Sequence, residues 1–143
     1  MTGKQKKWDL RFLEMAKLVA GWSKDPSTQT GAVISYPSNQ IVSVGFNGFP
    51  SRIKDDERLN IREVKYQMMV HCEVNALLFA KGDIDGCTLY TWPFMSCSRC
   101  ASVMIQAGIS RHVAPVNDNE RWKESFALSV KLFDEAGVQI QLY

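Results

Sequence analysis

Two short motifs combine side chains that could hold a metal ion with one that could move a proton. The first is H-C-E at residues 71–73, and the second is C-S-R-C at residues 97–100. One imidazole and two thiolates, from His71, Cys97 and Cys100, are a typical set of three protein ligands for zinc, and they leave the fourth tetrahedral position open for water. Glu73 is the type of group that takes a proton from such a water. The spacing therefore predicts a catalytic zinc centre with Glu73 as the proton shuttle.

Two other interpretations of the C-x-x-C pair are a redox-active dithiol and half of a structural zinc ribbon. A structural site normally closes with a fourth cysteine or histidine, but the sequence holds no second C-x-x-C motif. Glu73 also favours catalysis, because a structural metal does not need that carboxylate. We expect His112 to be a packed histidine of a buried strand, and Cys72 and Cys87 to be small packing residues.

The composition is that of an ordinary globular protein and predicts one domain over residues 1–143. The net charge is +2, and the basic residues are scattered among acidic ones, which argues against a nucleic-acid partner. The chain has neither an apolar run of membrane-spanning length nor a signal-peptide core at its N-terminus. Four cysteines, two of them in a C-x-x-C pair, favour metal binding in a reducing compartment over disulfides. We therefore expect a cytoplasmic protein without membrane partners.

Hydrophobic periodicity and turn residues predict alternating helices and strands along the chain. Helices are expected over residues 8–23, 70–80, 97–108 and 120–136, and strands over 31–36, 41–46, 87–92, 112–115 and 138–143. The charge-dense stretch 51–66 has no clean period and is expected to be a long loop that can include a short helix. This order predicts an α/β fold with helices on both faces of one sheet.

Helical spacing explains how the two motifs could meet at one metal. Cys97 and Cys100 are three residues apart, so both sulfurs project from one face at the start of a helix. His71 and Glu73 are two apart and can converge only where the chain is still entering its helix. Two facing helix N-termini, with their partial positive charge, would also favour the thiolates.

With these residues, the chain resembles the deoxycytidylate (dCMP) deaminases of the cytidine-deaminase-like superfamily. H-x-E followed by C-x-x-C is typical of zinc deaminases, in which the glutamate is the general acid and base rather than a ligand. Two further motifs narrow the resemblance to nucleotide deaminases: S-K-D-P-S-T-Q-T-G-A-V-I at residues 23–34 and V-G-F-N-G-F-P at residues 44–50. The resemblance covers essentially the whole chain.

The resemblance implies a fold, a reaction and an assembly. The fold would be a three-layer α/β/α arrangement with a five-stranded mixed sheet in strand order 2-1-3-4-5. The enzyme would hydrolyse dCMP to dUMP and ammonia with Zn²⁺ as cofactor, and its product would supply dTMP synthesis. Members are commonly homohexamers that dCTP activates and dTTP inhibits.

The resemblance also implies roles for residues outside the zinc motifs. Asn47 would contact the sugar, the backbone N–H of Cys72 would bond the pyrimidine carbonyl, and Ser23 and Lys24 would be candidates for the substrate phosphate. The effector site would lie near the segment that contains Gly45, Phe46 and Gly48.

The sequence departs from the family pattern at three positions. Ser96 replaces the proline that usually precedes the first cysteine, and Cys72 stands where alanine is usual. Phe46 replaces a tyrosine, which puts the response to effectors in question.

Trp122 has two interpretations: it either covers the base or packs against Phe126. There are also alternatives to dCMP deamination. The enzyme could deaminate dCTP, CMP or an adenine in tRNA instead, or the chain could be a non-catalytic zinc module.

Overall fold

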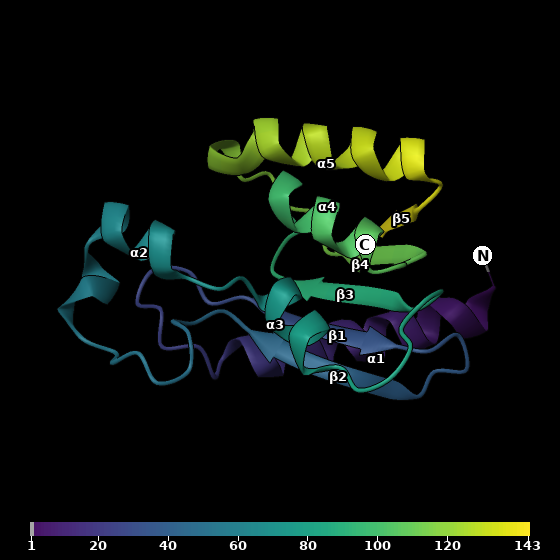
Figure 1. The fold of residues 1–143 in the computed structure, drawn as a ribbon. Helices are drawn as coiled ribbons and strands as arrows, with labels where there is room; N and C mark the ends of the chain where they lie inside the picture. Colours follow the sequence, from purple (N-terminus) through teal and green to yellow (C-terminus); the bar gives the residue numbers. More distant parts are fainter. Residues whose placement is uncertain (1) are drawn as a thin grey trace.

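A five-stranded mixed sheet forms the centre of the computed structural model, which describes residues 2–143 (Figure 1). The strand order is β2-β1-β3-β4-β5. β1 pairs antiparallel with β2 and with β3, whereas β3, β4 and β5 run parallel to one another. The strands are β1 (Gly31–Ser35), β2 (Ile41–Phe46), β3 (Thr88–Trp92), β4 (Arg111–Ala114) and β5 (Gln139–Leu142). The predicted order 2-1-3-4-5 is confirmed.

Helices cover both faces of the sheet, as predicted. The helical segments are α1 (Gly3–Ala20), η1 (Glu57–Asn60), α2 (Arg62–Met68), α3 (Cys72–Phe79), α4 (Ser98–Gln106), η2 (Glu120–Trp122) and α5 (Lys123–Ala136). α1 packs on one face, where Phe12 and Leu13 meet Val33 and Tyr90 of the sheet. α3, α4 and α5 share the core of the opposite face, to which they contribute Ala76, Met104 and Phe133, among others.

α3 packs closely on β2, and the absence of a side chain at Gly45 allows this approach. A Cβ atom at Gly45 would stand 2.4 Å from the backbone nitrogen of Ala76 and 2.6 Å from the carbonyl oxygen of Cys72. Any side chain at this position would push α3 away from the sheet. Because α3 begins at the H-C-E motif, this contact helps to set the position of the motif.

The predicted elements occur at their predicted places with shifted ends, and one helix exceeds the prediction. The stretch expected as a long loop contains η1 and α2, and α2 extends to Met68. α2 lies away from the sheet (Figure 1) and is tied to the rest of the chain by Lys65, whose ammonium lies 3.0 Å from a carboxylate oxygen of Asp25. Both side chains are buried. This contact joins residues 40 positions apart, so local periodicity could not indicate it.

A buried carboxylate ties α1 to the far edge of the sheet. Asp9 is fully buried and accepts hydrogen bonds from the hydroxyls of Tyr90 and Tyr143 and from the guanidinium of Arg111. Burial alone would raise the pKa of Asp9, but these hydrogen bonds lower it below its usual value. The carboxylate therefore stays ionised and holds β3, β4 and the end of the chain against α1.

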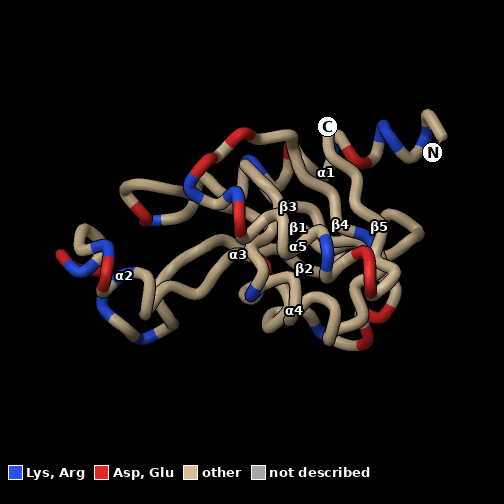
Figure 2. Tube along the Cα trace, turned by 90° about the horizontal axis from the view of Figure 1, so that it is seen from above, with Lys and Arg blue, Asp and Glu red and all other residues tan. Residues whose placement is uncertain are grey.

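Residues of both charges are intermixed along the folded chain (Figure 2). Figure 2 shows Lys and Arg interspersed with Asp and Glu, and both signs occur around α2. Within residues 2–143, no helix combines the length and the apolar character that crossing a bilayer requires.

Candidate active site

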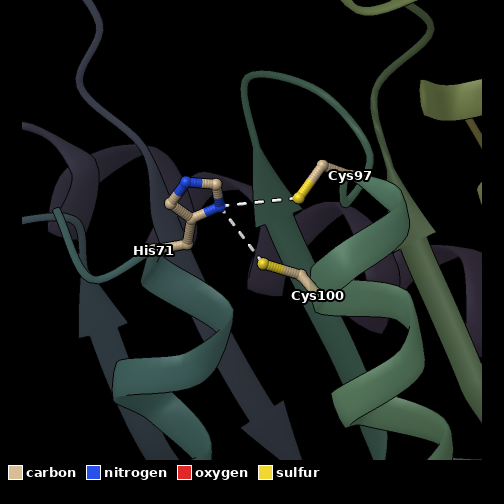
Figure 3. Close-up of side chains that lie close together, drawn as sticks. All are labelled: His71, Cys97 and Cys100. Atoms are coloured by element: carbon tan, nitrogen blue, oxygen red, sulfur yellow. Dashed lines mark hydrogen bonds between the residues drawn. The ribbon is translucent and has the colours of Figure 1, made fainter. Parts of the chain in front are cut away.

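The three predicted metal ligands come from the first residues of two neighbouring helices. His71 is the N-cap of α3 and Cys97 is the N-cap of α4, both with extended backbone, and Cys100 lies in the first turn of α4. Figure 3 shows the three side chains pointing toward one another. A two-way backbone bridge between Gly48 and Val70 fixes the chain directly before His71. The predicted placement at two facing helix starts is therefore what the structure shows.

The spacing of the three donor atoms fits a tetrahedral zinc ion. The Nδ1 atom of His71 lies 3.2 Å from the sulfur of Cys100 and 3.5 Å from that of Cys97. All three donor atoms lie within 4.8 Å of one another. Zinc bonds of usual length at a tetrahedral angle would separate a nitrogen and a sulfur ligand by about 3.6 Å. These residues could therefore hold zinc with little movement and leave one coordination position for another ligand.

The two thiols differ in how readily they ionise. The hydrogen bond with Cys100 lowers the pKa of Cys97 to about 5. Burial acts in the opposite direction, and a hydrogen bond with His71 lowers the pKa further. The hydrogen bond between Cys97 and Cys100, together with burial, raises the pKa of Cys100. The hydrogen bond with Cys97 raises the pKa of His71. One thiolate is thus present at neutral pH, and metal binding would have to displace the proton of the second.

Glu73 lies in the first turn of α3 and is only 6% exposed. One of its carboxylate oxygens accepts a hydrogen bond of 3.0 Å from the thiol of Cys72. Burial is the main cause that raises the pKa of the Cys72 thiol well above its usual value, so the thiol stays protonated and remains a donor. The carboxylate faces the same cavity as His71 and Cys97.

That cavity has a volume of about 360 Å³. His71, Glu73 and Cys97 line one part of it. Phe94, Met95 and Phe126 supply apolar lining, and Tyr66, Arg99, Arg121 and Trp122 also line it. A cavity with apolar lining and a few polar groups is typical of a site for a small molecule.

The predicted substrate residues fall into two groups. Asn47 and Cys72 line the cavity, and Cys72 is the first residue of α3, where backbone N–H groups have no partner within the helix. Asn47 also holds the neighbouring loop in place: its amide oxygen accepts a hydrogen bond from the backbone N–H of Thr30, and its amide nitrogen donates one to the carbonyl oxygen of Thr28. Ser23 and Lys24 do not line the cavity.

Ser23 and Lys24 have other partners in the structure. The Ser23 hydroxyl is buried and donates to the carbonyl oxygen of Asn47. Lys24 is exposed and pairs with Asp55 at 3.1 Å. The three residues predicted near an effector site also lie outside the cavity lining: Gly45 packs on α3, Gly48 bridges to Val70, and the exposed Phe46 ring meets Trp22 edge to face.

His112 supports the loop that leads to Cys97. It is fully buried, as predicted, and its Nε2 accepts the backbone N–H of Ser96 at 3.1 Å. Its Nδ1 lies 2.9 Å from the carbonyl oxygen of Leu89, to which it donates. Burial lowers the pKa of His112, which keeps the ring neutral and suits this pattern of one donor and one acceptor. The carbonyl oxygen of Ser96 accepts a bond from Ser129.

Sequence analysis did not indicate several residues of the cavity. Lys65, Tyr66, Arg99 and Arg121 line it, although no motif marks them. Only Arg99 could have been predicted to lie near the site, because it stands between the two cysteines of the C-S-R-C motif. Trp122 lines the cavity, half-buried, with its ring 6.4 Å from that of Tyr66.

A known family matches this arrangement of zinc ligands and carboxylate. The family model described as the cytidine and deoxycytidylate deaminase zinc-binding region matches residues 6–115, a range that contains His71, Glu73, Cys97 and Cys100. The chain belongs to this family. The predicted family, the enzyme class of zinc-dependent deaminases and the zinc cofactor are thereby confirmed.

Individual relatives agree with the family. The chain is 47% identical over 137 residues to an uncharacterised deaminase in the luxG 3′ region of Aliivibrio fischeri, with 94% of this chain and 92% of that protein covered. It is 34% identical over 143 residues to the deoxycytidylate deaminase of Homo sapiens, with 95% and 79% covered.

A solved structure shares the fold. The dCMP deaminase of the cyanophage S-TIM5, crystallised with dCMP and dUMP, superimposes with a TM-score of 0.78 at 21% identity. The comparison covers 100% of this chain and 99% of that chain. The predicted cytidine-deaminase-like fold is confirmed.

Proposed function

We propose that this protein is a single-domain enzyme that hydrolyses dCMP to dUMP and ammonia. The observation that supports this most directly is the convergence of His71, Cys97 and Cys100 at one point, together with the buried carboxylate of Glu73, which lines the same cavity as His71 and Cys97. Five of the related proteins are named deoxycytidylate deaminases or probable ones at 34–37% identity, which supports dCMP as the substrate.

His71, Cys97 and Cys100 would hold zinc. When bound there, zinc supplies a Lewis acid that makes a water molecule more acidic. Glu73 would accept one proton from the water, and the water oxygen would attack the amino-bearing carbon of the cytosine ring. Glu73 would return this proton to the ring nitrogen, then take the remaining proton of the hydroxyl added to that carbon and deliver it to the departing amine, so that ammonia leaves and a carbonyl remains. The hydrogen bond from Cys72 holds one oxygen of Glu73, which favours one orientation of the carboxylate.

The remaining lining residues would orient the nucleotide. The backbone N–H of Cys72 would bond the pyrimidine carbonyl, because the first N–H groups of a helix are free to bind an acceptor. Asn47, already fixed by the loop around Thr30, would contact the sugar. A role at the phosphate would require Lys24 to leave Asp55, or the Ser23 hydroxyl to leave the carbonyl oxygen of Asn47.

We further propose the assembly and regulation that are common in the family: a cytoplasmic homohexamer with a dCTP and dTTP effector site near Gly45, Phe46 and Gly48. Exposed apolar side chains on α3 and α4 are consistent with contact between subunits. Leu78 is 68% exposed, Phe79 58% and Val103 44%. The product dUMP would supply dTMP synthesis.

The first test is ammonia release from dCMP, CMP, deoxycytidine and dCTP in parallel, with wild-type protein and the Glu73→Ala variant. We expect dCMP to be preferred and the variant to lose about 10²–10⁴-fold in kcat while keeping its zinc. Glu135→Ala, an exposed carboxylate on α5, is the control and should have normal activity.

A preference for dCTP would support the proposed deamination reaction but would overturn dCMP as the substrate. Equal function and zinc content in Glu73→Ala and wild type would instead favour a non-catalytic zinc module. Zinc measured per chain in each variant separates loss of metal from loss of the proton shuttle.

A further inference from the structure

Arg121 stands at the cavity with its charge uncompensated. It belongs to η2, and its guanidinium carbon lies 5.0 Å from the ring centre of Tyr66 and 5.5 Å from that of Trp122. Tyr66 comes from α2 and Trp122 from η2, so two elements far apart in the chain contact the same guanidinium. Contact with aromatic rings restricts a guanidinium while leaving its in-plane N–H donors available.

The charges that line the cavity favour an anionic ligand. Lys65 and Asp25 neutralise each other at 3.0 Å. Within residues 2–143, neither Arg99 nor Arg121 makes an ion pair or a side-chain hydrogen bond, and both line the cavity. A zinc ion and two thiolate ligands would compensate each other, so among the other lining groups the positive charges of Arg99 and Arg121 exceed the one negative charge of Glu73. A phosphate would supply the missing negative charge and would accept bonds from a guanidinium in the paired geometry that arginine prefers.

Lys24 is less well placed for this role in the structure. Its side chain is 72% exposed, it pairs with Asp55, and it does not line the cavity. Arg121 needs neither to break an ion pair nor to move to another surface. Arg121 is therefore better placed than Lys24 to bind a phosphate in the cavity.

We propose that Arg121 binds the 5′-phosphate of the substrate and so makes the enzyme select a nucleoside monophosphate over the corresponding nucleoside. This inference rests on the proposed deamination of dCMP and assigns a specificity residue to it. Tyr66 and Trp122 position the guanidinium, and Arg99 adds positive charge to the same cavity.

The test compares kcat/KM for dCMP and for deoxycytidine in wild type, Arg121→Gln and Arg121→Lys. We expect Arg121→Gln to lower kcat/KM for dCMP at least ~10-fold, mainly through KM, and to leave deoxycytidine unchanged. Arg121→Lys should recover part of the loss, since lysine keeps the charge but not the paired donors. The matched control is Lys123→Gln, which removes an exposed positive charge two residues away that does not line the cavity.

Equal losses for both substrates in Arg121→Gln would assign Arg121 a structural role and overturn the proposal. An unchanged preference for dCMP would also overturn it, and a selective loss in Lys24→Gln would then assign the phosphate to Lys24.

A binding measurement separates this proposal from the proposed function. If the wild-type protein deaminates none of the nucleotides, the proposed function fails, but calorimetry of the zinc-loaded protein with dUMP and deoxyuridine still tests Arg121. A loss of ~10-fold or more in dUMP affinity in Arg121→Gln, with deoxyuridine unaffected, would support phosphate binding. Equal dUMP affinity in the two proteins would exclude it.

Discussion

Two ion pairs of this chain have nearly the same length but differ in burial, and this difference predicts which of them stabilises the cavity. Lys65 and Asp25 lie 3.0 Å apart with side chains 8% and 6% exposed, whereas Lys24 and Asp55 lie 3.1 Å apart with 72% and 34% exposed. We expect a double-mutant cycle with Lys65→Met and Asp25→Asn to give a large coupling free energy, and the matched cycle at Lys24 and Asp55 to give a small one.

The expected magnitudes follow from the surroundings of each pair. Two unit charges at about 4 Å attract by about 1 kcal/mol in water and by about 4 kcal/mol at an effective dielectric constant near 20. Removing one partner of a buried pair costs about 3–5 kcal/mol, whereas exposed pairs typically contribute about 0.2–1 kcal/mol. Asp25 keeps bonds from Ser27, Thr28 and Asn47 when Lys65 is lost, which reduces the cost. We therefore expect a coupling of about 2–3 kcal/mol for the buried pair and below about 1 kcal/mol for the exposed pair.

The assay is urea unfolding of each single and double variant at neutral pH with zinc in constant excess, since metal binding itself changes stability. A second readout is the KM for dCMP. Lys65 and Tyr66 are neighbours on α2 and both line the cavity, so a loosened α2 should raise KM more than it lowers kcat. Lys24→Met should lower the unfolding free energy by less than about 1 kcal/mol and should leave the KM for dCMP unchanged.

Equal coupling in the two cycles would refute the reasoning, because burial is the main difference between the pairs. A coupling below about 0.5 kcal/mol at Lys65 and Asp25 would show that the hydrogen bonds from the loop alone hold Asp25. An unchanged KM in a destabilised Lys65→Met protein would show that the position of α2 does not depend on this ion pair.

Two further predictions concern the frame of the site. Gly45→Ala should destabilise the fold by about 1–3 kcal/mol and weaken zinc binding, because its methyl group would meet the backbone nitrogen of Ala76 at 2.4 Å. The control is Gly48→Ala, whose methyl group would have no atom within 4 Å. Equal unfolding midpoints for the two variants would contradict the packing argument. Asp9→Asn should lower the unfolding free energy by about 3 kcal/mol near pH 7, since it breaks the buried pair with Arg111. The pKa of Asp9 is lowered in the folded protein, so its stabilisation is present above the usual value of 3.8 and is lost as the pH falls below it. Denaturant curves from pH 3 to pH 7 should therefore converge for wild type and variant at the acid end, and a constant difference would contradict this.

The metal-binding residues were predictable because their geometry is local. The spacing of Cys97 and Cys100 fixes two sulfurs at one helix start, and the H-C-E spacing requires His71 to precede its helix. Both conclusions follow from helical geometry within a few residues. The order of elements similarly indicated the sheet with helices on both faces.

The rest of the cavity was not predictable because it depends on contacts between distant segments. α2 lies in a stretch without periodicity, and its anchor Lys65 meets a partner 40 positions earlier. Arg121 meets Tyr66 across 55 positions (121 − 66) of sequence. Neither residue belongs to a motif, and only the folded chain places them at the same cavity as Glu73.

The contact between His112 and the loop before Cys97 makes the residue allowed at position 112 depend on the residue at position 96. Ser96 has a backbone N–H that needs an acceptor in a fully buried place, and the neutral ring of His112 provides it. Proline at position 96 would remove that N–H and with it the need for an acceptor at position 112. Sequences with proline at position 96 should therefore vary freely at position 112, whereas those with an N–H at 96 should retain histidine or another acceptor there. The residue before the first cysteine would thus record which of two ways a lineage uses to fix the same metal-binding loop.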